Sequence, residues 1–331
     1  MKTKVLFVHN YPSKFVESDL HLLQGRYAVS EWYQKSRLVN LPALARAISQ
    51  SDLVFGWFAS WHTFFPILLA RMLGKPSLLV VGGYDTANVP EISYGSQRGG
   101  IKKWVSRTAM HHSSQLIVNS IATRDEAISN ADIDPGRINV IYHGLKSSSS
   151  FATVPKENLA VTVGNVDRCN LKRKGLEPFV RAAGLIPEYE FVMIGAWRDD
   201  AIESLRMVAP SNVRFTGWVR DEELNKYYLR AAVYVQASRH EGFGLAVAEA
   251  MLHQCVPVVT RAGSLPEVVG EAGVYINSTE PREIAEGVRR ARAMMETLGP
   301  RARERILGEF RLGTREKLLF RTIDAMVGRY A

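Results

Sequence analysis

Short hydrophobic runs alternate with helical patterns along most of the chain. In the first half, apolar runs predict strands at residues 5–9, 53–58, 77–81, 115–118 and 139–142. Patterns of helical period between them predict helices, for example at residues 42–50, 63–73, 100–111 and 123–131. The strand runs are continuously apolar instead of alternating, which is typical of parallel sheets that helices cover on both faces.

The alternation stops at residues 145–158, LKSSSSFATVPKEN, which are rich in serine, contain Pro155 and show no sustained period. Such a stretch is typical of a linker. Beyond it the pattern restarts, with strands predicted at residues 159–163, 190–194, 213–216, 232–236, 256–260 and 273–276. Helices are predicted at residues 175–185, 200–208, 221–230, 245–253 and 281–295.

A chain of 331 residues exceeds one average domain of about 150, so two α/β domains are expected. We predict Rossmann-like, doubly wound parallel-sheet domains at residues 1–150 and 151–313, with an interdomain cleft. The helical pattern at residues 314–331 has no strand after it, and this helix is expected to cap either domain, packing back on the first one in our preferred arrangement. Doubly wound sheets bind ligands outside the carboxyl ends of their strands, so functional residues are expected in the strand-to-helix turns.

Composition narrows the class of protein. With 46% hydrophobic residues the chain can bury sizeable cores, and no apolar run reaches the roughly 18 residues of a membrane-spanning helix. The chain contains two cysteines, Cys169 and Cys255, which favours a reducing, cytoplasmic environment over a disulfide framework.

The net charge is +9, and the excess leans toward the first half. Residues 1–150 hold 16 Lys and Arg against 10 Asp and Glu, whereas residues 151–331 hold 26 against 23. This balance suits a polyanionic partner or anionic lipid, and equally simple solubility. Stacking aromatics interleaved with basic residues are not evident, so no nucleic-acid partner is expected.

The turn EGFGL joins the predicted strand at 232–236 to the predicted helix at 245–253. Gly242 and Gly244 lack a Cβ atom, so backbone can approach a ligand closely there. The N–H groups at a helix start favour an anion such as phosphate. An ordinary tight turn is the alternative interpretation, since glycine-rich turns before helices are common.

Two carboxylates accompany this turn. Glu241 precedes the helix, and Glu249 lies eight residues on, within roughly 80° of the same helical face. Glu249 stands among alanines, Val247 and Met251, where a carboxylate needs hydrogen-bond partners to offset desolvation. The two hydroxyls of a ribose would supply them. The alternative is a glutamate on the exposed face of a half-buried helix.

Four blocks in sequence order resemble retaining GT-B glycosyltransferases of glycosyltransferase family 4. They are VGNVDRCNLKRKGLEPFVRAA, VRFTGWVRDEELNKYYLRAAVYVQAS, SRHEGFGLAVAEAM and PVVTRAGSLPEVVGEAGVYI, and they cover about residues 159–280. The first half resembles the family more loosely, through VGGYD and VIYHG. The resemblance implies the GT-B fold and transfer of a sugar from a nucleotide-sugar donor.

The resemblance also implies roles for residues around the turn. Glu249 would bind the donor ribose and Glu241 the hydroxyls of the donor sugar. Val219 would offer its backbone to the base, and Asn165 stands where many members have arginine. The backbone that would hold sugar and diphosphate belongs to Gly242, Phe243, Gly244 and Leu245.

Two cations would neutralise the diphosphate in place of a metal ion, and no Asp-x-Asp motif is present. Lys174 is one of them. For the other, the choice lies between Arg168 and Arg173, and we favour Arg168. A solvated basic loop is the alternative for the run at 172–174.

The first domain is expected to bind the acceptor. Asp85, in VGGYD, and its neighbour Tyr84 would lie in the cleft, with Asp85 contacting substrate hydroxyls; capping of the next turn is the alternative for Asp85. His62 and His143 are further cleft residues, and a capping or packing role is the alternative for His62. Tyr11 follows the first strand, where many members have a glycine-rich loop.

Residues 98–112, RGGIKKWVSRTAMHH, form a basic helix that contains Trp104. Such a helix can lie on an anionic membrane, so peripheral contact with the inner face of the membrane is one interpretation. The other is an ordinary surface helix whose apolar stripe faces the sheet.

We therefore expect a retaining, metal-independent hexosyltransferase of class EC 2.4 in glycan biosynthesis. Its donor would be UDP- or GDP-linked, its acceptor a glycan, a lipid-linked molecule or a small molecule, and no cofactor is expected. A GT-B nucleotide-sugar epimerase, a phosphorylase and a non-catalytic nucleotide-sugar-binding protein remain alternatives. Sugar, base and acceptor stay open, because a turn that contacts the base through its backbone hides the identity of the base.

Overall fold

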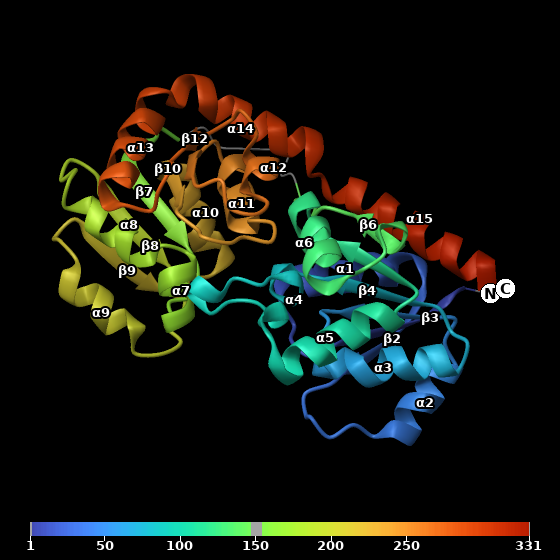
Figure 1. Ribbon diagram of the computed structural model, residues 1–331. Helices are drawn as coiled ribbons and strands as arrows, with labels where there is room; N and C mark the ends of the chain where they lie inside the picture. Colours follow the sequence, from blue (N-terminus) through green and yellow to red (C-terminus); the bar gives the residue numbers. More distant parts are fainter. Residues whose placement is uncertain (1, 147–153, 331) are drawn as a thin grey trace. The chain divides into compact units, whose positions relative to one another are not determined.

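The computed structural model describes residues 2–146 and 154–330 and divides into two compact units (Figure 1). The first unit contains Met1–Pro90, Tyr94–His143 and Leu312–Ala331, and the second contains Glu91–Ser93 and Gly144–Arg311. The units therefore divide a few residues before the predicted boundaries at 150/151 and 313/314. Most of the predicted linker, residues 147–153, lies outside the described residues.

The first unit is built on a six-stranded parallel sheet with strand order β2-β1-β3-β4-β5-β6. Its strands are β1 Lys4–His9, β2 Ala28–Tyr33, β3 Leu53–Trp57, β4 Ser77–Val81, β5 Gln115–Val118 and β6 Ile138–Val140. Its helices are α1 Lys14–Arg26, α2 Leu41–Ser49, α3 Trp61–Met72, α4 Gly83–Thr86, α5 Gly100–His112, α6 Ile121–Ala131 and α15 Leu312–Tyr330.

Both faces of this sheet are buried. On β1, Val5 and Phe7 pack in one hydrophobic cluster with Leu319 and Ile323 of α15, whereas Leu6 and Val8 pack in another with residues of α2. Successive side chains of a strand point to opposite faces, so a strand covered on both sides is apolar at every position. This explains the unbroken apolar runs in the sequence.

The second unit has the same architecture, with strand order β12-β11-β10-β7-β8-β9 and parallel pairing throughout. Its strands are β7 Glu157–Val163, β8 Glu190–Ile194, β9 Val213–Gly217, β10 Ala231–Gln236, β11 Val256–Val259 and β12 Val274–Tyr275. Its helices are α7 Arg168–Arg173, α8 Leu176–Ala183, α9 Ala201–Val208, α10 Asp221–Arg230, α11 Leu245–Leu252, α12 Leu265–Val269, α13 Pro281–Ala293 and α14 Met295–Glu309.

The two parallel sheets confirm the predicted doubly wound fold class, but several elements were missed. Helix α1 and strand β2 occupy residues 14–33, where the sequence analysis assigned no element. Strand β2 is an edge strand with mostly exposed side chains, so it lacks an apolar run. Helix α14 was missed because Gly299 and Pro300 interrupt its pattern. Strand β7 begins at Glu157, inside the predicted linker.

Helix α15 is tied to the first unit by a buried ion pair. Arg315 donates two hydrogen bonds to the carboxylate of Asp19 in α1, at 2.7 and 2.6 Å, and both side chains are buried. The same guanidinium donates to the backbone carbonyls of Ile141 and Tyr142. The start of α15 is thereby fixed to α1 and to the segment that follows β6.

Replacing Arg315 with alanine is expected to destabilise the first unit by about 3–5 kcal/mol, because Asp19 is left charged and buried without its partner. Denaturant unfolding measured by circular dichroism and tryptophan fluorescence tests this. Arg321→Ala removes an arginine from the exposed side of the same helix and serves as the control. Equal stability of both variants would contradict the assignment.

Candidate functional site

The carboxyl ends of the strands in the second unit come together through glycines. Gly164 follows β7 and Gly195 follows β8, and a Cβ atom on Gly195 would lie 2.0 Å from the carbonyl oxygen of Gly164. Gly195 also has φ 151°, a conformation that disfavours other residues. Backbone atoms of Gly164 and Gly195 therefore pack closely at this edge of the sheet. The side chains near this edge come from the segments that follow the strands.

Glu241 is the central carboxylate of this edge. Its Oε2 lies 3.6 Å from Nη1 of Arg173 and 3.8 Å from Nζ of Lys174, and the three side chains are only 13–14% exposed. Burial by itself raises the pKa of Glu241, but Lys174, Arg173 and a hydrogen bond from the N–H of Gly242 contribute to a net lowering of this pKa. Burial also lowers the pKa of Lys174. The site thus holds one carboxylate and two cations in a largely desolvated cluster.

The local sequence explains how the two cations reach Glu241. Helix α7 ends at Arg173, whose guanidinium donates to Oδ1 of Asn170 at 2.8 and 3.1 Å. Gly175 then turns the chain with φ 64°, where a Cβ atom would lie 2.3 Å from the carbonyl oxygen of Ala237. Lys174 lies across Gly164, where a Cβ atom would approach its Cδ to 2.8 Å. Glycine at 164 leaves room for the lysine, and glycine at 175 leaves room for the backbone of Ala237.

Arg168, which we favoured as the second cation, lies elsewhere. Its guanidinium forms a bidentate pair with Asp200 at 2.9 and 2.6 Å, and its side chain is 74% exposed. The geometry thus favours Arg173 over Arg168 as the partner of Lys174. The nearby Asn165 is exposed, and its carbonyl accepts a hydrogen bond from Asn170.

Glu249 lies on α11, four residues and so about one helical turn beyond Leu245. It is half-buried, and the hydroxyl of Tyr228 donates to its Oε2 at 3.4 Å. Helix α11 begins at Leu245, after Gly244 in the left-handed conformation with φ 91°. The turn at 242–245 thus leads directly into the helix that bears Glu249.

The rest of the glycine-rich turn is fixed by an aromatic contact. The ring of Phe243 is buried edge-to-face against Phe310, with 5.5 Å between ring centroids, while Gly242 is half-buried. Val219 is half-buried in the turn after β9, next to the exposed Trp218. The predicted donor-binding positions therefore share the carboxyl edge of the second sheet.

Sequence reasoning missed a row of buried polar side chains along β10. Tyr234 donates to Oε1 of Gln236, and Gln236 donates to Ser238 and to Glu241. The signal was present in the stretch VYVQAS, where polar residues occupy every second position of an otherwise apolar strand. Alternation of this kind places polar groups on one face of the strand.

In the first unit, Asp85 caps a helix. It is buried in α4, its Oδ2 accepts from the backbone N–H of Gly82 at 2.8 Å, and its carbonyl accepts from Ser96 and Gln97. Burial raises the pKa of Asp85 to about 7. The structure thus gives Asp85 the capping role that was the alternative interpretation. Its neighbour Tyr84 is exposed.

The two histidines proposed for the cleft are buried in the first unit. His62 is 1% exposed at the start of α3, its Nε2 bonds the carbonyl of Trp57 at 2.7 Å, and burial lowers its pKa to about 4. His143 stacks parallel to the ring of Trp57, and burial lowers its pKa as well. Both pack in the core, whereas Tyr11 is exposed.

Helix α5 carries apolar side chains that are exposed to solvent. Ile101 is 77% and Trp104 58% exposed, with Phe65 of α3 also exposed and Phe64 in ring contact with Trp104. Lys102 beside them is exposed. This end of the helix therefore does not follow the pattern of an apolar stripe facing the sheet. Within residues 2–146 and 154–330, no helix combines the length and the hydropathy that crossing a bilayer requires.

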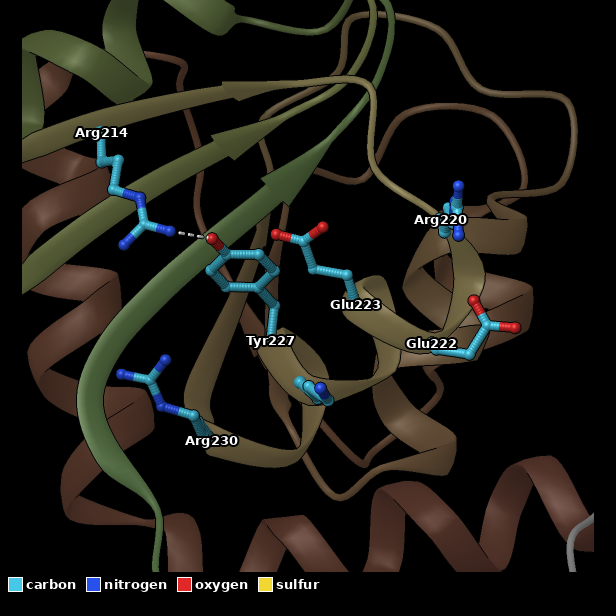
Figure 2. Close-up of a pocket in the computed structure, with 7 residues that line it drawn as sticks. Arg214, Arg220, Glu222, Glu223, Tyr227 and Arg230 are labelled. Atoms are coloured by element: carbon cyan, nitrogen blue, oxygen red, sulfur yellow. Dashed lines mark hydrogen bonds between the residues drawn. The ribbon is translucent and has the colours of Figure 1, made fainter.

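A charged pocket of about 570 Å³ lies elsewhere in the second unit, between β9 and α10 (Figure 2). Two of its arginines have close partners: Arg214 donates to the hydroxyl of Tyr227, and Arg230 forms a bidentate pair with Glu157. None of the predicted donor-binding residues lines it. The lining residues are Arg214, Arg220, Glu222, Glu223, Lys226, Tyr227 and Arg230.

The fold of the chain matches solved GT-B glycosyltransferases. Anabaena HepE in complex with UDP and glucose superposes with a TM-score of 0.79 at 16% identity, covering 98% of this chain and 100% of that chain. The two six-stranded sheets thus form a GT-B fold.

Sequence comparison gives the family. A model of Glycosyltransferase Family 4 matches residues 4–148, and a model of Glycosyl transferases group 1 matches residues 157–293, so the chain belongs to glycosyltransferase family 4.

Curated relatives have related names. O-antigen chain mannosyltransferase B of Escherichia coli is 39% identical over 119 residues, covering 33% of this chain and 31% of the relative. Alpha-maltose-1-phosphate synthase of Mycolicibacterium smegmatis is 26% identical over 294 residues, covering 76% of this chain and 73% of the relative. The chain spans between about a third and somewhat over half of the first curated relatives that it matches.

Asp85 should make the stability of the first unit depend on pH. Its pKa rises from 3.8 to about 7 on folding, so folding favours the protonated form. Its stabilising contribution is complete below about pH 4 and is lost as the pH rises through 7. Denaturant unfolding between pH 4 and 8 should show a flatter profile for Asp85→Asn than for the wild type. The exposed Asp125→Asn is the control, and parallel profiles for all three proteins would refute the assignment.

Proposed function

We propose that the chain is a retaining hexosyltransferase that moves a sugar from a UDP- or GDP-linked donor to an acceptor hydroxyl. The cluster of Glu241, Arg173 and Lys174 at the carboxyl edge of the second sheet carries this proposal. A nucleoside diphosphate gains negative charge as the glycosidic bond breaks, and two cations fixed in a desolvated site stabilise that charge.

In this proposal, the remaining donor contacts come from the same edge of the sheet. Glu249 accepts hydrogen bonds from the ribose hydroxyls, and Glu241 contacts the hydroxyls of the sugar. The backbone at 242–245 lies against sugar and diphosphate, and Val219 offers its backbone to the base. The solved complex of HepE with UDP-glucose, whose fold this chain shares, supports a nucleotide-sugar donor.

The transfer step follows from the charge on the leaving group. The bond from the anomeric carbon to the diphosphate oxygen breaks, and a bond from that carbon to the acceptor oxygen forms on the same face. The proton of the acceptor hydroxyl passes to the leaving diphosphate. Arg173 and Lys174 supply the positive charge that this step requires, so a divalent metal is not part of the proposed reaction.

Nucleotide binding tests the proposal directly. Calorimetric titration with UDP, GDP, ADP and dTDP should show binding of at least one of them, and the matching sugar nucleotide should be hydrolysed slowly to free sugar and nucleoside diphosphate in the presence of EDTA. Conversion to an epimeric sugar nucleotide would indicate an epimerase, and binding without turnover a non-catalytic protein. Absence of binding to all four nucleotides would reject the proposed function.

Two arginine variants locate the cations within the same assay. Arg173→Gln should weaken binding of the nucleoside diphosphate about tenfold or more, since a hydrogen bond to a charged group contributes about 1.5–3 kcal/mol. Arg168→Gln should bind within about twofold of the wild type. A larger loss of nucleotide binding in Arg168→Gln than in Arg173→Gln would assign the diphosphate contact to Arg168.

The exposed apolar and basic surface of α5, which we call the α5 surface, fits an anionic membrane on which a lipid-linked acceptor would lie. It is defined by Arg98, Ile101, Lys102, Lys103, Trp104 and Arg107. Exposed apolar side chains next to basic ones suit the interface of an anionic bilayer.

Sedimentation with vesicles tests the α5 surface. The protein should sediment with vesicles of 30% phosphatidylglycerol in phosphatidylcholine, and this binding should weaken with salt, because each basic residue near the surface contributes about 1 kcal/mol. Ile101→Ser with Trp104→Ser should reduce sedimentation, whereas Met207→Ser on α9, an equally exposed apolar residue, should not. Unchanged binding of the double variant would rule out this surface.

A further inference from the structure

The polar row on β10 ends at the carboxylate of Glu241. The hydroxyl of Tyr234 donates to Oε1 of Gln236 at 2.9 Å. Nε2 of Gln236 then donates to Oγ of Ser238 at 2.6 Å and to Oε2 of Glu241 at 3.1 Å. Because an ionised carboxylate only accepts hydrogen bonds, the amide nitrogen of Gln236 must face Glu241, and the tyrosine holds the amide oxygen on the other side.

The hydrogen bond from Gln236 to Glu241 is formed by a buried amide. Gln236 is 2% exposed in the middle of the second sheet, where β10 lies between β11 and β7. A polar group in such a place must find its partners within the protein, and these partners fix its orientation. The amide is therefore a rigid neutral donor behind Glu241, fixed by Tyr234 and Ser238.

The same carboxylate oxygen faces two cations at longer distances. The amide nitrogen lies 3.1 Å from Oε2, whereas the nitrogens of Arg173 and Lys174 lie at 3.6 and 3.8 Å. Charge-assisted hydrogen bonds between cations and carboxylates close to about 2.7–2.9 Å when nothing opposes them. The amide of Gln236 and the backbone N–H of Gly242 thus hold Glu241 more closely than either cation does. The cations also have partners of their own, since Arg173 donates to Asn170 and Lys174 to the carbonyl of Val163.

We propose that Gln236 is a positioning residue that keeps Glu241 out of a closed ion pair with Arg173 and Lys174. This inference rests on the proposed function. The carboxylate, stabilised by a neutral donor, stays in place for the sugar hydroxyls, and the two cations can turn toward a diphosphate. A cationic side chain in place of Gln236 would pair with Glu241, and an anionic one would repel it.

A double-mutant cycle separates positioning from simple packing. Gln236→Met keeps the length of the side chain and removes all three of its hydrogen bonds. It should raise the Kd for UDP or GDP, whichever the wild type binds, about tenfold, and lower kcat for hydrolysis of the matching UDP-glucose or GDP-mannose about tenfold, because the closed ion pair competes with the diphosphate.

The second half of the cycle repeats the change in a chain that carries Glu241→Gln. There, Gln236→Met should change either quantity by less than about twofold, since Gln236 acts through the carboxylate. Equal losses in both backgrounds would show a packing role and overturn the inference. Wild-type behaviour of Gln236→Met would overturn it as well.

The pH profile of Gln236→Glu gives an independent readout. At pH 8 the introduced carboxylate repels Glu241, and hydrolysis should fall by about tenfold or more. Toward pH 5.5 the introduced carboxyl gains a proton and can donate to Glu241, so the ratio to wild type should recover. A ratio that does not change with pH would count against the inference.

Separate control experiments test whether the variants fold and whether the proposed function holds. Circular dichroism melts verify that each variant is folded. If Gln236→Met does not fold, Tyr234→Phe, which leaves both hydrogen bonds of the amide nitrogen in place, should give a smaller loss in the same direction. Failure of the wild type to bind any nucleotide would overturn both the proposed function and this role. Normal binding by the wild type with unaffected variants would overturn only the role of Gln236.

Discussion

The chemistry of the second unit depends on how one buried carboxylate is balanced. Glu241 loses its water at the end of β10, and Arg173, Lys174 and Gln236 replace the water. With cations as its only partners, the carboxylate would form a closed ion pair. With a neutral donor as its only partner, ionisation of the buried carboxyl would be energetically unfavourable. The combination keeps Glu241 ionised at neutral pH while two positive charges remain loosely coordinated, at distances that a bound anion can shorten.

This balance depends on backbone positions that only glycine accommodates. A Cβ atom at Gly175 would collide with the carbonyl of Ala237, and one at Gly263 would lie 2.2 Å from the carbonyl of Glu241. Both residues have positive φ. Ser264 then donates its backbone N–H to the same carbonyl at 3.1 Å. The main chain of Glu241 is thereby held by the segment 263–264.

The fold was predictable because its strands are buried on both faces and alternate with helices. Edge strand β2 was not predicted because most of its side chains are exposed, so it has no apolar run. Helix α14 was not predicted because a Gly-Pro pair interrupts its helical pattern. At the candidate site, the places of Glu241, Lys174 and Glu249 near the carboxyl edge of the second sheet were predictable from the glycine-rich turn and the basic run, whereas their roles stay predictions. Arg168 and Arg173 could not be separated by sequence, since the pairing of Arg168 with Asp200 joins residues 32 positions apart. The burial of His62 and His143 is likewise a tertiary property.

The charged pocket beside α10 shows why volume alone does not locate a site. Arg230 in its lining pairs with Glu157 on the surface, where water screens the charges and ion pairs contribute little. Around Glu241 the cations are more buried and their contacts are longer, which is the less stable arrangement for the apo protein. Such an arrangement, maintained by Gln236 against the closure that electrostatics favours, is expected where a protein must exchange an internal carboxylate for the phosphates of a ligand.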